Sequence, residues 1–158
     1  MRNTPSGAGQ HKGEIPDTDY TVPIGKGEVK REGEDVALIT YGSTVHLALE
    51  AAEILAREDG VGTRVVDLRT LLPLDVDLIL ESVRATGKVL IVHEANLTGG
   101  IGGEIAALIA ERAFQDLDAP IRRLGALDTP VPYAPTLEEE VLPTTAKIVA
   151  ALRGLCAY

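Results

Sequence analysis

The sequence predicts an α/β fold, a three-layer α/β/α sandwich built on a mostly parallel sheet with one antiparallel edge strand. Two observations lead to this prediction. Short, uniformly apolar segments alternate with longer segments whose apolar residues recur at helical spacing, and such segments are typical of strands covered on both faces. In addition, the short apolar segment Val89 to Val92 runs into a polar, glycine-rich turn and then a long helix. This alternation implies right-handed crossovers between parallel strands.

Ordered structure is expected to begin near Tyr20. Residues 1–19 are rich in Gly, Pro, Ser, Asn and Thr, show neither a helical nor a strand period, and are predicted to be a flexible leader. Residues 20–158 are then predicted to form one domain. Its first segment, Val22 to Glu32, is expected to be an extended edge strand, because Pro23 stands at its start and charged residues alternate along it.

Four buried strands and three intervening helices are expected next. The strands are placed at Val36 to Tyr41, Thr63 to Asp67, Val89 to Val92 and Ile121 to Leu124. The first helix starts after Ser43 or Thr44, either of which can act as N-cap. The apolar stripes of the three helices are Val45, Ala48, Leu49, Ala52 and Leu55; Val76, Ile79, Leu80 and Val83; and Ile105, Leu108, Ile109 and Ala113.

The C-terminal part is predicted to be irregular first and then helical. Three prolines stiffen Asp128 to Pro135, which is expected to cross the surface as an irregular arm. A short turn begins at Leu137. Pro143 is placed in the first turn of a last helix, whose apolar stripe is Ile148, Ala151, Leu152 and Leu155.

Charge and composition exclude several classes of function. A formal net charge of −9 makes nucleic acid an unsuitable partner, because phosphate backbones are bound through a surplus of lysine and arginine. Aromatic residues make up 3% of the chain, and tryptophan is absent, so platforms for base stacking are missing as well. A basic protein partner is favoured instead. The candidate docking residues are Glu138, Glu139 and Glu140, although such runs are more often only a solvated surface.

The sequence predicts neither a membrane segment nor a disulfide framework. Its longest apolar runs are broken within a few residues by charge or glycine, and residues 1–12 lack the apolar core of a signal peptide. Cys156 is the single cysteine and is expected to be inert. A cytoplasmic location is therefore expected.

Candidate functional residues follow the third buried strand, because ligands of parallel α/β folds bind at the carboxyl ends of the strands. They are His93, Glu94, Gly99, Gly100, Gly102 and Gly103. The glycines either allow a close helix–strand or subunit contact or let a ligand approach the backbone. His93 is either a structural histidine or a group whose tautomer Glu94 sets. His46 is either a structural histidine or part of a subunit interface.

A dinucleotide site is rejected at this turn. Ile105 stands where the fingerprint requires its third glycine, and the strand that follows does not end in an acid that could hold a ribose. No residue is assigned as catalytic, cofactor-binding or metal-binding. Arg69, at the end of the second buried strand, is expected to form a structural salt bridge.

Several separate blocks, in the same order, resemble the β subunit of thiamine-dependent 2-oxo acid dehydrogenases. They are Tyr20 to Gly33, Leu38 to Glu53, Val65 to Asp75, Val92 to Ala95 with the glycines after it, Leu127 to Pro130, and Leu142 with Pro143. The resemblance is to the C-terminal domain of the pyruvate or branched-chain dehydrogenase E1 component, which is transketolase-like, and it runs from Tyr20 to the C-terminus.

This resemblance implies a heterotetramer of α and β subunits that holds thiamine diphosphate and magnesium between the α subunit and an N-terminal domain of β. It further implies transfer of an acyl group to the lipoyl group of E2, with the coenzyme carrying the difficult chemistry. The sequence lacks that N-terminal domain, so no bound cofactor and no independent activity are expected of it. Its implied partners are the E1 α subunit, a second β subunit and the basic subunit-binding domain of E2.

Two hypotheses remain at this point. In the first, the chain is a C-terminal enzyme domain that acts in subunit assembly and E2 docking, or the matching domain of a transketolase or a deoxyxylulose-phosphate synthase. In the second, it is a free-standing module that binds an anion or a small molecule at the turn Gly99 to Gly103 and the following helix N-terminus. The first is favoured, because that turn lacks a lysine or arginine and Glu104 would repel an anion.

Overall fold

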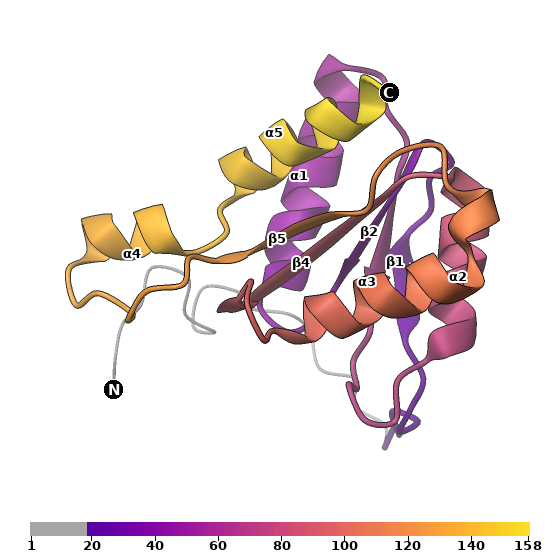
Figure 1. Cartoon of the computed structure of the whole chain (residues 1–158), viewed down its shortest axis with the longest axis horizontal. Coiled ribbons are helices and arrows are strands. Elements are labelled where there is room, and N and C mark those ends of the chain that lie inside the picture. The colour runs from indigo at the N-terminus through magenta and orange to yellow at the C-terminus, as the bar shows by residue number, and fades with distance from the viewer. Residues whose placement is uncertain (1–18) are drawn as a thin grey trace.

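The computed structural model describes residues 19–158, which form one five-stranded sheet with helices on both faces (Figure 1). The strands are β1 (Glu28–Arg31), β2 (Val36–Thr40), β3 (Thr63–Asp67), β4 (Val89–Asn96) and β5 (Arg122–Ala126). The helices are α1 (Thr44–Glu58), α2 (Val76–Thr86), α3 (Ile101–Arg112), the 3-10 turn η1 (Phe114–Asp116), α4 (Pro135–Val141) and α5 (Thr145–Cys156). Apart from Asp19, the predicted leader lies outside the described residues.

The sheet has the order β1-β3-β2-β4-β5. Strands β2, β3, β4 and β5 are parallel, and β1 pairs with β3 in the antiparallel direction. The predicted mostly parallel sheet with an antiparallel edge strand is therefore confirmed. The edge strand is shorter than expected, because only Glu28–Arg31 pairs with β3 and the chain before it turns at Gly25, whose φ is 80°.

Two hydrophobic clusters fill the space on either side of the sheet. One joins β2 and β4 to α1 and α5 through residues such as Leu38, Leu55 and Leu152. The other joins the opposite faces of the same strands to α2 and α3 through residues such as Ile39 and Ile105. Because the central strands are covered on both faces, every residue of β2 is buried, as a parallel sheet requires. The three-layer arrangement is confirmed.

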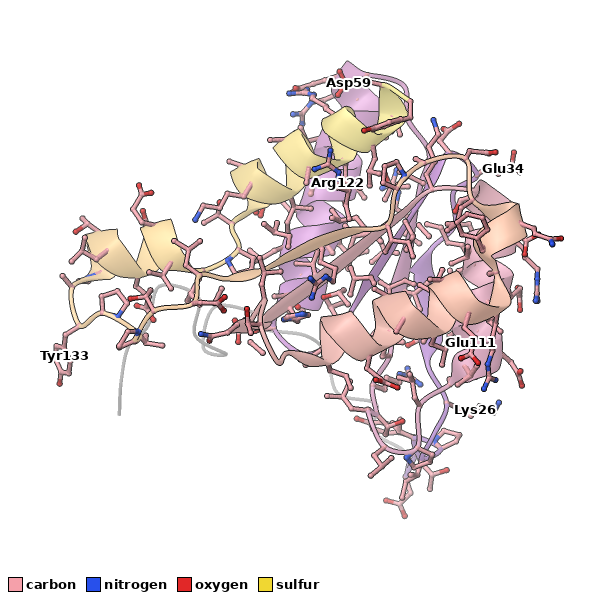
Figure 2. The ribbon with its side chains drawn as sticks, viewed as in Figure 1. Lys26, Glu34, Asp59, Glu111, Arg122 and Tyr133 are labelled. Carbon is pink, nitrogen blue, oxygen red and sulfur yellow. The ribbon has the colours of Figure 1, made fainter. Side chains whose placement is uncertain are left out.

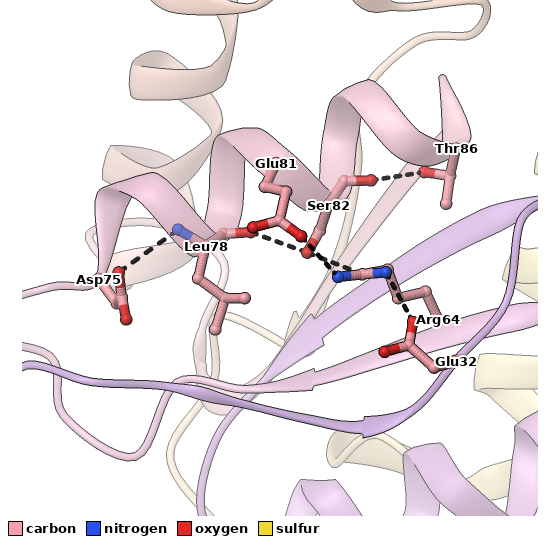
Figure 3. Close-up of polar contacts among 7 residues, drawn as sticks. All are labelled: Glu32, Arg64, Asp75, Leu78, Glu81, Ser82 and Thr86. Atoms are coloured by element: carbon pink, nitrogen blue, oxygen red, sulfur yellow. Dashed lines mark hydrogen bonds and ion pairs between the residues drawn. The ribbon is translucent and has the colours of Figure 1, made fainter. Parts of the chain in front are cut away.

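Arg64 of β3 joins the sheet edge to α2 (Figure 3). Its guanidinium donates to the carboxylates of Glu32 at 2.7 Å and Glu81 at 3.2 Å, and to the hydroxyl of Ser82 at 3.2 Å. The Arg64 side chain is only 12% exposed, so these acceptors supply the partners that its donors would otherwise find in water. The network fixes how α2 lies across β3.

Helix α2 begins at a cap that also holds the segment before β1. Asp75 accepts hydrogen bonds from the backbone N–H of Leu78 at 3.4 Å and of Gly27 at 3.1 Å. Gly27 belongs to the segment that precedes β1, and the buried carboxylate therefore joins two regions that are far apart in sequence. Gly87 ends the helix with a left-handed φ of 66°.

Further sequence predictions require correction. Strand β4 continues to Asn96, and β5 is Arg122–Ala126, because a bulge after Val92 lets Asn96 pair with Ala126. Pro143 precedes α5 and is not in its first turn, because the hydroxyl of Thr144 accepts the N–H of Lys147 at 3.3 Å and sets the cap there.

The predicted irregular arm leaves β5 after Ala126 and extends away from the sheet (Figure 1). Tyr133 points outward near its far end (Figure 2). Leu137 lies in the seven-residue helix α4, a longer element than the short turn predicted for it. The amine of Lys147 donates to three carbonyl oxygens at the end of α4, those of Glu139, Glu140 and Leu142, at 2.7, 2.7 and 2.9 Å.

Candidate functional site

The carboxyl ends of β2 and β4 form the topological switch point of the sheet. These strands are neighbours, but the chain leaves β2 toward α1 on one face and leaves β4 toward α3 on the other. Parallel α/β sheets place their ligand crevices at such points. The structure therefore brings the candidates His93 and Glu94 beside Tyr41 and Ser43, which follow β2.

A hydrogen bond between Ser43 and Glu94 crosses this switch point. The hydroxyl of Ser43 donates to the Glu94 carboxylate at 2.6 Å. Ser43 occupies the predicted N-cap position of α1, but its side chain makes no capping bond. Burial, together with the negative charge of Glu94, raises the pKa of the Tyr41 phenol. Glu94 therefore bonds to Ser43, which follows β2. It does not set the tautomer of His93, the role that the sequence suggested for it.

His93 is fully buried at the end of the apolar run of β4. By strand alternation it lies on the same face as Val89 and Ile91, which pack toward α2 and α3, and its imidazole stacks on Tyr41 with 6.4 Å between ring centroids. Its Nδ1 lies 2.9 Å from the carbonyl oxygen of Ala95, which can only accept, so Nδ1 carries the proton. Nε2 is then a buried acceptor, and it has no hydrogen-bond partner among the described residues.

The environment keeps His93 neutral. Burial is the main cause that lowers the pKa of the imidazole, and the nearby positive charge of Arg123 lowers it further, while the bond to Ala95 acts in the opposite direction. A neutral, inaccessible imidazole cannot exchange a proton with a substrate in the crevice. Its position instead indicates a structural role between the sheet and α3.

The glycines make room for this imidazole. A Cβ added to Gly102 would lie 2.3 Å from His93 Nε2, and one added to Gly100 would lie 2.8 Å from His93 Cε1. Gly125, on β5, also borders the ring, where a Cβ would be 3.0 Å from Cε1. At each of the three positions an added Cβ would force the ring or its neighbours to shift. Of the two readings of the glycine run, close helix–strand contact is the one that the geometry supports.

The other two glycines of the turn have different surroundings. Gly99 adopts a φ of 75°, which favours glycine, and nothing lies within 4 Å of its Cβ position. The Cβ position of Gly103 has one neighbour, Arg123 Nη1 at 3.4 Å. Arg123 donates from the same nitrogen to the carbonyl of Leu97 at 3.1 Å. Strand β5 thus brings to the turn a cation that the turn's own sequence lacks.

This geometry does not make a phosphate site. The unpartnered Nε2 of His93 is an acceptor and would oppose an anion, and the exposed carboxylates of Glu94 and Glu104 flank the same helix N-terminus. The Ser43 hydroxyl donates to the exposed Glu94 carboxylate, but among residues 19–158 no third residue hydrogen-bonds that carboxylate to orient it as a catalytic base. The arrangement locks the ends of two strands together.

A second polar contact joins the β4 turn to the arm. Thr98 donates its hydroxyl to Asp128 at 2.6 Å and its backbone N–H at 3.2 Å. These two bonds lower the pKa of the Asp128 carboxyl. With Asn96, Thr129 and Pro130, the pair lines a shallow pocket at the carboxyl edge of the sheet. Sequence reasoning missed this contact, although both residues follow parallel strands whose ends meet at one edge.

The remaining candidates lie apart from the switch point. Glu138, Glu139 and Glu140 are on α4, at the end of the arm. Arg69 donates to Glu28, as the salt-bridge reading expected, and holds a left-handed φ of 56°.

Neither the single cysteine nor a group of metal ligands adds a reactive site among the described residues. The thiol of Cys156 is partly buried, which raises its pKa and disfavours the reactive thiolate. In the described part of the chain no three His, Cys, Asp or Glu side chains are grouped so that they could hold a metal ion. Nor is any helix there long and apolar enough to span a membrane.

The fold and this arrangement agree with the comparison of the chain with known families. The model of the transketolase C-terminal domain matches residues 25–148. The chain therefore belongs to the family of transketolase C-terminal domains. The resemblance inferred from the sequence blocks is confirmed.

Individual relatives narrow the comparison to β subunits of 2-oxo acid dehydrogenases. The chain is 51% identical over 148 residues to the 2-oxoisovalerate dehydrogenase subunit beta of Bacillus subtilis, covering 93% of this chain and 45% of that protein. It is 42% identical over 145 residues to the pyruvate dehydrogenase E1 component subunit beta of the same organism, covering 92% of this chain and 44% of that protein. The chain thus spans less than half the length of these relatives.

A solved structure of a split gene transketolase, described as an inactive beta4 tetramer, has the same fold. Its TM-score is 0.77 at 32% sequence identity, and the match covers 92% of this chain and 46% of that one. The expected transketolase C-terminal architecture is confirmed by this neighbour.

Proposed function

We propose that this chain is the C-terminal domain of the β subunit of a thiamine-dependent 2-oxo acid dehydrogenase E1. The observation that carries the proposal is its 51% identity to a 2-oxoisovalerate dehydrogenase subunit beta across 93% of the chain. The enzyme as a whole decarboxylates a 2-oxo acid oxidatively and passes the acyl group to E2 lipoamide. This domain contributes to subunit assembly and to E2 docking, and it acts in the cytoplasm.

Thiamine diphosphate and magnesium would supply the chemistry of the intact enzyme, and the residues of this domain do not fit them. At the switch point, the groups that face the crevice are Glu94, with the Ser43 hydroxyl already bonded to it, and the Thr98–Asp128 pair. These carboxylates would repel a diphosphate, and the described residues offer no magnesium cluster. We therefore assign the cofactor to other domains of the enzyme and no catalytic step to the described residues of this chain.

Rigid presentation of its surfaces is what the geometry of this domain supports. The Ser43–Glu94 bond joins the ends of β2 and β4, and the buried His93 fits beneath the first turn of α3. Such locked elements let the domain serve as a fixed body against which an E1 α subunit and a second β subunit can pack.

The acidic helix α4 is the proposed E2 docking site. Lys147 holds the carbonyl end of this helix, while no salt bridge within the described residues engages Glu138, Glu139 or Glu140. The three carboxylates are therefore available to a basic partner. At the rim of an interface, opposite charges mainly speed the encounter of two proteins.

Surface plasmon resonance against the basic subunit-binding domain of a matching E2 tests this role. Replacing Glu138, Glu139 and Glu140 with glutamine should lower the association rate several-fold at low salt and change the dissociation rate less. The effect should shrink as salt rises, because the screening length is about 8 Å at physiological ionic strength. The matched control replaces three exposed acids elsewhere, Glu53, Asp77 and Glu111, and should keep most of the association rate.

Equal effects of the two triple variants would remove α4 from the docking site. Assignment to the E1 enzyme is tested separately. A chain extended with the N-terminal part of a relative's β subunit should co-purify with an E1 α subunit and show activity with thiamine diphosphate. If it instead forms an active transketolase, the alternative favoured by the split gene transketolase neighbour would replace the proposal.

A further inference from the structure

Exposed apolar side chains lie in two separate segments at the carboxyl edge of the sheet. Among the described residues, ten large hydrophobic side chains are exposed, and eight of them lie in two segments, Tyr20 to Ile24 with Leu72, and Leu127 to Leu137. Ile24 is 80% exposed and Leu72 is 93% exposed. Apolar clusters of this kind mark surfaces that another polypeptide covers.

Both segments stand at the carboxyl edge of the parallel strands. Leu72 follows the end of β3, and the backbone N–H of Gly25 donates to Thr70 at 3.0 Å, so Ile24 is held beside the same loop. Leu127 directly follows β5 and donates its N–H to the carbonyl of Val141 at 3.1 Å. Figure 2 labels Lys26, two residues after Ile24, and Tyr133, in the second segment, at separate places on the molecule.

We propose that this apolar edge, composed of Val22, Ile24, Leu72, Leu127 and Val131, binds the polypeptide that precedes this domain in its longer relatives. The inference rests on the proposed role of the chain in the assembly of an E1 β subunit. It names the surface and the occupant.

Chain length and chain direction point to this occupant. The matched region makes up 45% of the 2-oxoisovalerate dehydrogenase subunit beta, and the family model describes a C-terminal domain, so most of that relative precedes the match. The described chain enters at Asp19 to Ile24, which is part of the apolar edge. A preceding domain therefore arrives where the exposed side chains are.

Charge argues against a second copy as the occupant. The exposed carboxylate of Glu94 follows β4 at the same edge, and the exposed carboxylate of Asp128 directly follows Leu127. Two copies placed edge to edge would bring these carboxylates together, and like charges facing one another at an interface disfavour association. A different polypeptide can place donors or cations there.

Hydrogen exchange provides the test. The matched region of the Bacillus subtilis 2-oxoisovalerate dehydrogenase subunit beta is replaced with residues 20–158, and the exchange of this chimera is compared with that of the full 158-residue chain alone. Peptides covering residues 20–27, 68–75 and 127–134 should exchange at least about tenfold more slowly in the chimera. Peptides around Phe114 and Tyr158, which are 72% and 65% exposed, are internal controls and should not change.

Protection that appears only at the two controls, or at neither set, would overturn the proposal. Loss of dehydrogenase activity in a chimera that still shows the expected protection would count against the proposed function and leave the docking surface in place. The full chain supplies a second measurement that does not depend on the chimera. In it, Ile24→Ser with Leu72→Ser should leave the melting temperature within about 2 °C of the parent, because these side chains contact little of their own domain.

A larger fall in melting temperature would place the two side chains in the domain's own core and refute the docking role. Analytical ultracentrifugation of the full chain tests the other possible occupant, a second copy of the chain. A concentration-dependent dimer that the same double substitution abolishes would assign the edge to a second copy, against the proposal.

Discussion

His93 and the glycines around it hold β4, β5 and α3 in close contact. The imidazole occupies a space that exists only because Gly100, Gly102 and Gly125 have no side chains. The group that looked most like a catalyst in the sequence is therefore a packing residue. Its one bonded nitrogen faces its own strand, and its other nitrogen faces the first turn of α3.

Substitution of the glycines distinguishes packing from ligand contact. Gly102→Ala should destabilise the domain by roughly 1–3 kcal/mol, because the new Cβ would meet His93 Nε2 at 2.3 Å. Gly103→Ala is the matched control one position along the same helix. It should be neutral or stabilising by up to about 1 kcal/mol, because only the flexible end of Arg123 is near and alanine is the better helix former. Urea unfolding measures both; equal effects would contradict the packing role.

The stability of the domain should depend on the protonation of His93. Its pKa is lowered from 6.5 in the folded state, so the unfolded chain binds the proton more readily. Stability is thus fully present above about pH 6.5 and falls as the pH drops from there toward the lowered folded pKa. No acid compensates the charge directly: Tyr41 stacks on the ring, Arg123 repels the proton, and Glu94 is bonded to Ser43.

Urea unfolding between pH 7.5 and pH 5 measures this dependence, whose slope from one proton is at most about 1.4 kcal/mol per pH unit. His93→Gln should flatten the dependence in that window, relative to the parent chain. His46→Gln, a substitution of an exposed histidine on α1, should retain it. A parent chain with no loss of stability in this range would show that His93 accepts a proton without cost.

Individual elements are positioned by polar groups at their ends. Asp75 accepts the N–H of Leu78 at the start of α2 and the N–H of Gly27 before β1, and it lies 3.6 Å from the amine of Lys26. Thr144 accepts the N–H of Lys147 at the start of α5. These caps fix where α2 and α5 begin.

Asp75→Ala should cost roughly 1–3 kcal/mol of stability, because it removes a helix cap and leaves two backbone N–H groups without their acceptor. It should also speed hydrogen exchange at residues 25–27, far from α2 in sequence. Asp77→Ala is the control, since Asp77 is exposed in the first turn and its loss removes only a weak interaction with the helix dipole, about 0.3–1 kcal/mol. If both variants exchange alike at residues 25–27, Asp75 does not hold that segment.

At the scale of the whole molecule, the described residues form one domain with distinct surfaces, and no complete active site is assigned among them. The hydrogen bond between Ser43 and Glu94 lies at the switch point, and the exposed apolar side chains lie at the same edge of the sheet. The acidic helix α4 extends beyond the sheet on the arm (Figure 1). This division suits a domain that works by contact with other subunits.

Calorimetric titration of the full 158-residue chain with thiamine diphosphate and magnesium should show weak binding or none. The physical reason is that the carboxylates of Glu94 and Asp128 face the crevice, where a diphosphate would need cations or free N–H donors. Titration with magnesium alone serves as the control for non-specific binding. Tight, magnesium-dependent binding of the cofactor would show that its site lies within this chain.

Local patterns were enough to predict most of the fold. The apolar runs at β2, β3 and β4 and the stripes of α1, α2 and α3 are properties of neighbouring residues, and period alone distinguishes them. For the same reason, the order of strands and helices and the antiparallel edge strand could be predicted. The ordered sequence blocks, from Tyr20 to the C-terminus, also indicated the family.

Only the tertiary structure decided how the candidate site is used. The bulge after Val92 depends on the pairing of Asn96 with Ala126 in a strand thirty residues away, and the fit of His93 against Gly102 depends on how α3 packs across β4. The bond of Ser43 to Glu94 and the approach of Arg123 to Gly103 likewise join segments that are distant in sequence. Such contacts follow from the register and crossing of packed elements, whereas a sequence pattern reports only its own local period; the sequence by itself therefore determined which residues lie at the switch point, and packing determined that they form a structural lock.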